Sequence, residues 1–162
     1  MAQISLRDVL HDNWRATLGL TVHPEQQRFI ADYVPIAAIA LAKAYVRPGG
    51  LVWVPFAIYA DQQLVGFIEL ACEPDSRQRY WVYHFFIDQA YQGKGYGKAA
   101  LDVFVQTVQA RYPRCQHLNL TVHRENTCAQ HVYMSVGFRP TGAEQDGEPV
   151  YTLQLVDRSK SD

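Results

Sequence analysis

A glycine-rich segment between a strand-like run and a helix-like run is the feature that most constrains the fold. The run Tyr80–Ile87 is rich in aromatic and β-branched residues, as strands are. After the glycines, apolar residues recur at three- and four-residue intervals until Pro113, which predicts an amphipathic helix. His117–Val122 again has the pattern of a strand. The glycines therefore lie at the strand-to-helix turn of a β-α-β unit, whose two strands should be parallel.

The flanking sequence extends this unit into a larger sheet. Val54–Ala60, Gln63–Cys72 and Tyr80–Ile87 are separated by short polar turns, which predicts an antiparallel meander. Val150–Val156 alternates as a final strand after the turn dipeptide Asp146-Gly147. We therefore expect a mixed sheet.

Helical spacing predicts the elements that cover this sheet. The first fifty residues should form two or three helices, the last of which ends before Pro48. A further short helix should begin after Asn126, an N-cap residue, and end at Gly137, which tolerates the left-handed conformation. The predicted class is α/β, or α+β by a stricter definition, with a mostly antiparallel sheet, one parallel strand pair and flanking helices.

Length and composition favour a single globular domain over residues 1–156, followed by a polar C-terminal tail at residues 157–162. Fifteen basic and sixteen acidic residues give a net charge of -1, so general nucleic-acid binding is not expected. The most apolar stretch, Val34–Ala42, is far shorter than the roughly 20 residues that cross a bilayer, which argues against membrane insertion. Three cysteines without a Cys-x-x-Cys pair, and an N-terminus unlike a signal peptide, favour a cytoplasmic location.

The glycine-rich turn is suited to a phosphate or pyrophosphate. The first N–H groups of a helix have no intrahelical partner, and glycines let the backbone approach an anion. Lys94 and Lys98 add positive charge. A P-loop is excluded because Ala99 follows Lys98, and a dinucleotide fold is disfavoured because the chain offers a single β-α-β unit. A helix start that merely happens to be glycine-rich is the simpler alternative.

The segment Gln92-Gly93-Lys94-Gly95-Tyr96-Gly97 resembles the Q/R-x-x-G-x-G/A motif of the GNAT superfamily of N-acetyltransferases. A second block agrees with that family in the expected order, with Asn126 near the start of a helix and Tyr133 two turns later. The similarity covers about residues 50 to 156. Three segments look like the bacterial spermidine/spermine acetyltransferase branch: Phe86-Ile87-Asp88, residues 91–95 and residues 142–148. The resemblance implies a parallel strand pair that splays apart, with acetyl-CoA as co-substrate.

The resemblance also implies which residues bind acetyl-CoA. The residues expected to contact the pantetheine arm or the pyrophosphate are Phe85, Phe86, Ile87, Gln92, Gly93, Lys94, Gly95, Tyr96, Gly97 and Lys98. Asn126 is either a further contact or only an N-cap. Tyr133 is either the acid that protonates the departing thiolate or a core tyrosine.

A protonated amine must lose a proton before it attacks a thioester. Glu69 and His84, on the strands beside the expected cleft, are the candidate bases, and a water relay is the alternative. His117 and His123 lack a cluster of cysteines or carboxylates and should be surface histidines, so no metal site is expected.

These residues predict an enzyme that transfers an acetyl group directly from acetyl-CoA to a small-molecule primary amine, for which a polyamine is one candidate. Four carboxylates could attract a polycation if they shared one cleft: Glu25, Glu69, Glu73 and Asp75. A non-catalytic acyl-CoA-binding or sensor module is the competing prediction. Exposed strand edges favour a homodimer.

Overall fold

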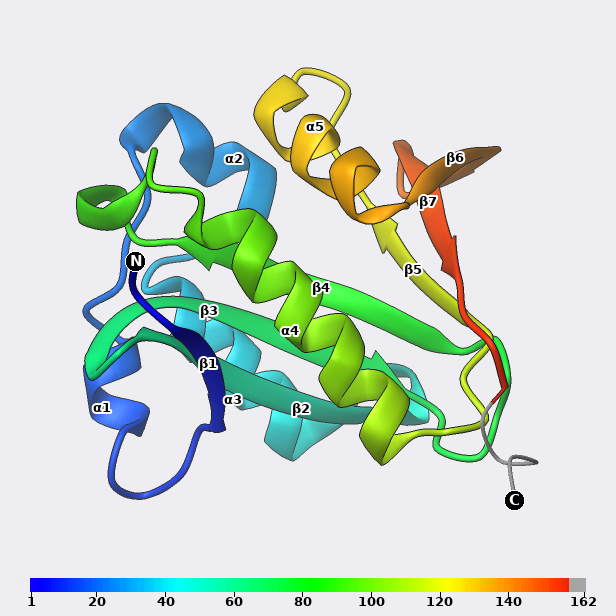
Figure 1. Ribbon diagram of the computed structural model, residues 1–162, viewed down its shortest axis with the longest axis horizontal. Helices are drawn as coiled ribbons and strands as arrows, with labels where there is room; N and C mark the ends of the chain where they lie inside the picture. Colours follow the sequence, from blue (N-terminus) through cyan, green and yellow to red (C-terminus); the bar gives the residue numbers. More distant parts are fainter. Residues whose placement is uncertain (158–162) are drawn as a thin grey trace.

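The computed structural model describes residues 1–157, which form seven strands and five α-helices (Figure 1). The strands are β1 (Ile4–Asp8), β2 (Val52–Ala60), β3 (Gln63–Cys72), β4 (Tyr80–Ile87), β5 (His117–Thr121), β6 (Arg139–Gln145) and β7 (Glu148–Gln154). The helices are α1 (Trp14–Thr17), α2 (Gln27–Ile30), α3 (Ile36–Val46), α4 (Tyr96–Arg111) and α5 (Thr127–Val136), with 3-10 turns η1 (Pro24–Gln26), η2 (Pro48–Gly50) and η3 (Gln89–Tyr91). The predicted tail lies outside the described residues except for Asp157, whose carboxylate is 3.6 Å from the Arg77 guanidinium.

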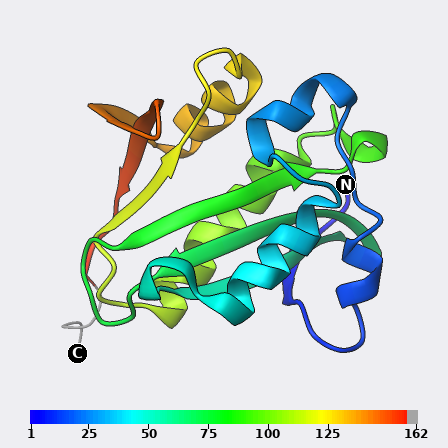
Figure 2. The same cartoon turned by 180° about the vertical axis from the view of Figure 1, so that it is seen from behind.

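All seven strands belong to one sheet in the order β1-β2-β3-β4-β5-β7-β6. The predicted meander β2-β3-β4 is antiparallel, and the predicted β-α-β unit makes β4 and β5 the one parallel pair of the described sheet. These two strands pair at a single position, Trp81 with Asn119, and then diverge (Figure 2). The predicted mixed sheet with one splayed parallel pair is therefore confirmed.

Helices cover both faces of the sheet. On one face α4 packs over a core that includes Phe56, Ile68, Leu70, Leu101 and Phe104 (Figure 1). On the other face α3 lies across β2 and contributes to a second core that contains Ile36, Ala37, Ala40, Phe67 and Phe86 (Figure 2). Within residues 1–157, no helix has the length and apolar content needed to cross a bilayer.

Two strands were not predicted from the sequence. β1 is five residues long and pairs antiparallel with β2, whereas its region was expected to be helical. β6 contains a proline and a glycine, and six of its seven residues are exposed, so it carries no apolar period. Both strands are held by backbone pairing to a neighbouring strand. Such pairing leaves no periodic pattern of apolar side chains, so the sequence could not predict these strands.

A bulge interrupts β4 beside β3. Phe67 pairs with Phe86 but Glu69 pairs with Tyr83, so β4 carries one extra residue here, and His84 has a left-handed φ of 49°. Because of the bulge, the consecutive side chains of Tyr83 and His84 both reach Lys43 of α3. The bulge thus places a polar cluster on the α3 face of the sheet.

Candidate active site

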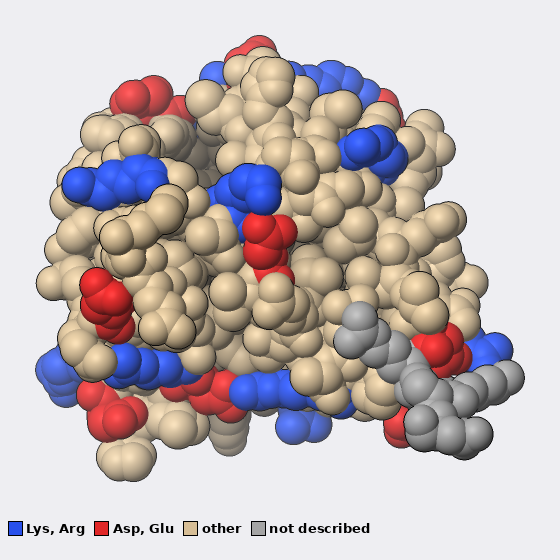
Figure 3. Space-filling view, viewed as in Figure 1, with Lys and Arg blue, Asp and Glu red and all other residues tan. Residues whose placement is uncertain are grey.

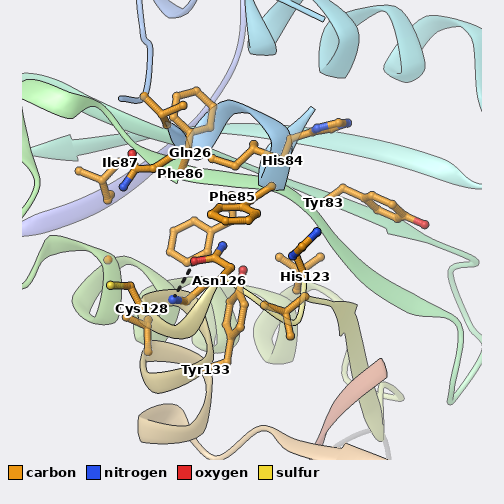
Figure 4. A pocket seen from close by; sticks show the side chains of 18 of the residues that line it. Gln26, Tyr83, His84, Phe85, Phe86, Ile87, His123, Asn126, Cys128 and Tyr133 are labelled. Carbon is orange, nitrogen blue, oxygen red and sulfur yellow. Dashed lines mark hydrogen bonds between the residues drawn. The ribbon is translucent and has the colours of Figure 1, made fainter. Parts of the chain in front are cut away.

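A cavity of about 800 Å³ opens where β4 and β5 diverge (Figure 4). One end, here called the glycine end, is lined by Ile87, Gly93, Gly95 and Gly97. Away from these glycines the lining includes three carboxylates, Asp32, Asp146 and Glu148, and this part is here called the carboxylate end; Lys43 and Tyr83 line the cavity as well. The cavity therefore runs along β4 from the start of α4 to the β6–β7 hairpin.

The glycine end presents unpaired backbone donors. The N–H groups of residues 93 to 98 donate to no carbonyl or side chain in the described part of the chain, and the first hydrogen bond of the helix is from Ala99 N–H to the Gly95 carbonyl. Gly93 and Gly95 have φ values of 79° and 81°, and a Cβ on either would enter open space. This cradle fits a pyrophosphate, because a helix N-terminus with free N–H groups stabilises anions.

The two lysines of the motif differ in their surroundings. Lys98 lines the cavity, and its ammonium is 3.0 Å from the Asp102 carboxylate one turn along α4. Lys94 is not among the residues that line the cavity. The backbone, more than these lysines, shapes the anion cradle.

Gln92 connects the glycine loop to the N-terminal segment. Its Nε2 donates to the Ile87 carbonyl at 2.9 Å and to Gln26 Oε1 at 2.9 Å, while Gln26 Nε2 donates back to Gln92 Oε1 at 3.1 Å. Sequence reasoning did not find Gln26, since nothing local marks a partner 66 residues away. The pair fixes the loop against η1.

Tyr133 extends from α5 toward Phe85, whose ring centroid is 6.2 Å from its own (Figure 4). The Tyr133 side chain is buried, and its hydroxyl has no hydrogen-bond partner among residues 1–157. Burial, and to a lesser degree the charge of Glu148, raise the pKa of Tyr133. The residue therefore holds its proton at neutral pH and can act as a donor into the cavity.

Asn126 is the N-cap of α5, as predicted. Its Oδ1 accepts a hydrogen bond from Ala129 N–H at 3.3 Å, and the residue also lines the cavity (Figure 4). The cap explains the residue structurally, and a contact with a ligand stays a prediction.

The two predicted bases lie on the α3 face, with different access to the cavity. Glu69 is fully buried and does not line the cavity; both carboxyl oxygens lack hydrogen-bond partners, and burial raises its pKa to about 8 against an opposing effect of Lys43. His84 lines the cavity, and its Nε2 is 3.1 Å from the Lys43 ammonium. Burial and Lys43 lower the pKa of His84 to about 4, so the imidazole is neutral at pH 7.

The four carboxylates considered from the sequence do not line this cavity. Its carboxylate end is instead formed by Asp32, ahead of α3, and by Asp146 and Glu148 of the β6–β7 hairpin. Asp32 is more than a hundred positions before the two hairpin residues, so only the fold brings them to one cavity. β6 carries no apolar signal, so the sequence predicted neither the hairpin nor its approach to the cavity.

Two contacts between α2 and the β5–α5 loop form a roof over the cavity. The Arg28 guanidinium is 2.7 Å from the Glu125 carboxylate, and the Phe29 and His123 rings lie 5.0 Å apart. His123, as part of this roof, is half-buried and lines the cavity. Among the described residues, no three His, Cys, Asp or Glu side chains gather as a metal site would require.

Unpaired N–H groups at the start of α4, beside a parallel strand pair that splays apart, are the arrangement expected of an acetyl-CoA-dependent N-acetyltransferase. The family model described as the acetyltransferase (GNAT) family matches residues 5–138, and the chain belongs to this family.

A sequence relative supports this assignment, and two solved structures share the fold. The chain is 31% identical over 158 residues to the spermine/spermidine N(1)-acetyltransferase of Bacillus subtilis (strain 168), covering 94% of this chain and 99% of the relative. Among solved structures, spermidine N-acetyltransferase from Vibrio cholerae, in complex with CoA and spermine, superposes with a TM-score of 0.70 at 18% identity and covers 96% of each chain. RimL, a ribosomal alpha-N-protein acetyltransferase in complex with coenzyme A, gives a TM-score of 0.73 at 16% identity, again over 96% of each chain.

Proposed function

We propose that the protein acetylates a primary amine of a polyamine. The observation that carries this proposal is the carboxylate end of the cavity, where Asp32, Asp146 and Glu148 line the end opposite the pyrophosphate cradle. A chain of ammonium groups is complementary to such carboxylates, which attract cations across a few ångströms. The name of the 31% identical relative agrees with this substrate class.

The two substrates bind at opposite ends of the cavity. Acetyl-CoA binds with its pyrophosphate on the cradle at Gly93, Gly95 and Gly97, and its pantetheine arm takes the place beside β4 that β5 leaves free. The amine enters from the carboxylate end. This arrangement brings the amine nitrogen and the thioester carbon together in the cleft between the strands.

The transfer needs no covalent enzyme intermediate. The amine nitrogen attacks the thioester carbon, a C–N bond forms and the C–S bond breaks. Backbone N–H groups of β4 near Phe86 are the proposed donors to the transient oxyanion. Tyr133 gives its proton to the departing thiolate and is reprotonated, through water in the cavity, by the proton that the nitrogen loses as the amide forms.

Deprotonation of the amine is the remaining step. An amine of ordinary pKa is neutral in roughly one part per thousand at pH 7, which costs about 4 kcal/mol. His84 is weakly basic and engages Lys43, while Glu69 has no access to the cavity, so neither is placed to take the proton by direct contact. A water relay past this cluster is therefore the proposed route.

Thiol release from acetyl-CoA with a panel of amines tests this function. We expect kcat/KM for spermine and spermidine to exceed that for a monoamine of similar length by more than about tenfold, because the additional ammonium groups meet the carboxylates. Asp146→Asn should raise KM for the polyamine and leave KM for acetyl-CoA unchanged. Exclusive use of a peptide N-terminus would contradict the polyamine assignment. Coenzyme A binding without thiol release on any amine would favour the non-catalytic module.

A further inference from the structure

Lys43 is the one charged residue of α3, a helix otherwise built from apolar residues. Its ammonium lies 3.1 Å from His84 Nε2 and sits over two aromatic rings, 5.1 Å from the Trp53 centroid and 5.3 Å from the Tyr83 centroid. Contacts with ring faces stabilise a cation that is partly removed from water. The fold therefore holds a positive charge in the cavity wall beside β4.

The titratable groups facing Lys43 leave that charge without a close counter-ion. β3 contributes Glu69 and β4 contributes Tyr83 and His84, while Asp32, ahead of α3, acts on His84. Lys43 has no carboxylate within 4.0 Å in the described part of the chain. Burial raises the pKa of Glu69 to about 8, so this neighbour is mostly neutral at pH 7.

We propose that Lys43 is a positioning residue for amine deprotonation, whose ammonium favours the neutral form of the acceptor amine in the cavity and keeps the His84 imidazole neutral, with its proton on Nδ1. This inference rests on the proposed function. The tautomer follows from the geometry, because an ammonium has no acceptor and must donate to an unprotonated Nε2.

The electrostatic effect on substrate has a definite sign. A like charge a few ångströms from the bound amine disfavours the ammonium form and lowers the pKa of that amine. Asp32, Asp146 and Glu148 act in the opposite direction on the remote ammonium groups of a polyamine. Lys43 contacts Tyr83 and His84, so its charge acts most strongly on an amine nitrogen that binds beside β4.

Lys43→Met tests the inference, since methionine retains an apolar chain of similar length without charge. In the complex with spermine, we expect the alkaline rise of kcat to move upward by about one pH unit, because the pKa of the bound amine rises. Lys43→Arg should retain most of the wild-type profile. Arg47→Met removes a cation from the end of the same helix, outside the cavity, and should leave the profile unchanged.

A substrate-free measurement separates this inference from the proposed function. In the wild-type protein, nitrogen-detected NMR should show a neutral His84 with its proton on Nδ1 near pH 7, assigned with His84→Asn, and Lys43→Met should raise the pKa of His84. An unchanged His84 titration, or an unchanged kcat profile in a folded Lys43→Met enzyme, would overturn the inference. Lys43→Gln supplies the same readouts if the methionine variant does not fold. If the proposed function is wrong, in contrast, the wild-type protein itself will acetylate no amine.

Discussion

The Tyr133 hydroxyl has no hydrogen-bond partner in the described structure, so its removal should affect catalysis more than stability. Tyr133→Phe retains the ring contacts with Phe85 and Phe138 and removes no hydrogen bond of the described structure, so stability should change by less than about 1.5 kcal/mol. If the hydroxyl protonates the thiolate, kcat should fall by roughly 10² or more with KM for acetyl-CoA little changed. A thioester with a better leaving thiolate should recover part of this loss. Wild-type turnover with chemistry rate-limiting would show that Tyr133 is a packing residue.

Gly95 and the turn glycine Gly50 have similar backbone conformations, but only Gly95 belongs to the proposed pyrophosphate cradle. Gly95 and Gly50 have φ values of 81° and 72°, and a Cβ at either would meet no protein atom within 4 Å. Valine at either position should therefore strain the backbone to a similar degree. Gly95→Val should also weaken coenzyme A binding by more than about tenfold, measured by calorimetry, because its side chain fills the cradle. Equal coenzyme A affinities for Gly95→Val and Gly50→Val would show that the cradle is not part of the coenzyme A site.

At the scale of elements, the packing of α3 on β3 and β4 makes stability depend on pH through Glu69. The folded pKa of about 8 lies above the ordinary 4.5, so Glu69 binds an extra proton on folding and its contribution is lost as pH rises between these values. His84, with a folded pKa of about 4 against 6.5, opposes this trend below pH 6.5. Between pH 6.5 and 8 the Glu69 effect should dominate, at up to about 1.4 kcal/mol per pH unit.

Denaturant unfolding of Glu69→Gln checks this dependence. Glutamine matches the neutral carboxyl in shape, so the variant should resemble the wild type near pH 6.5 and exceed it in stability near pH 8. A parallel pH dependence for the two proteins would show that Glu69 titrates with an ordinary pKa.

Elements that bury an apolar face were predictable, and elements that depend on pairing alone were not. β3 and β4 were predicted with the observed bounds because their long apolar runs lie in the core. β1 and β6 lack such runs. The His84–Lys43 contact also lay beyond prediction, because it depends on a β4 bulge and on a helix placed across the sheet.

At the scale of the whole molecule, charge is distributed without a dominant sign. The net charge is -1, and acidic and basic side chains are interspersed on the face in Figure 3. Attraction of a polyamine should therefore come from the carboxylate end and be short in range. KM for spermine should rise several-fold between about 0.05 M and about 0.5 M salt, while KM for a monoamine changes less. Equal salt dependence for both would place substrate attraction outside the carboxylate end.

The site was predictable where its signal is local. The glycine loop, Asn126 and Tyr133 stand in contiguous motifs, whereas Asp32, Lys43 and Asp146 reach the cavity from three separate segments. Those segments are assembled by tertiary packing, and no short pattern marks them. The expected homodimer stays a prediction.

The single residue pair between β4 and β5 leaves two strand edges in the middle of a folded sheet. Such edges ordinarily invite β-strands of other chains and lead to aggregation. Here the roof formed by Arg28, Phe29, His123 and Glu125 narrows the approach to these edges. The contacts that cover the cavity should therefore also protect these edges against aggregation, and we expect variants that break them to be less soluble.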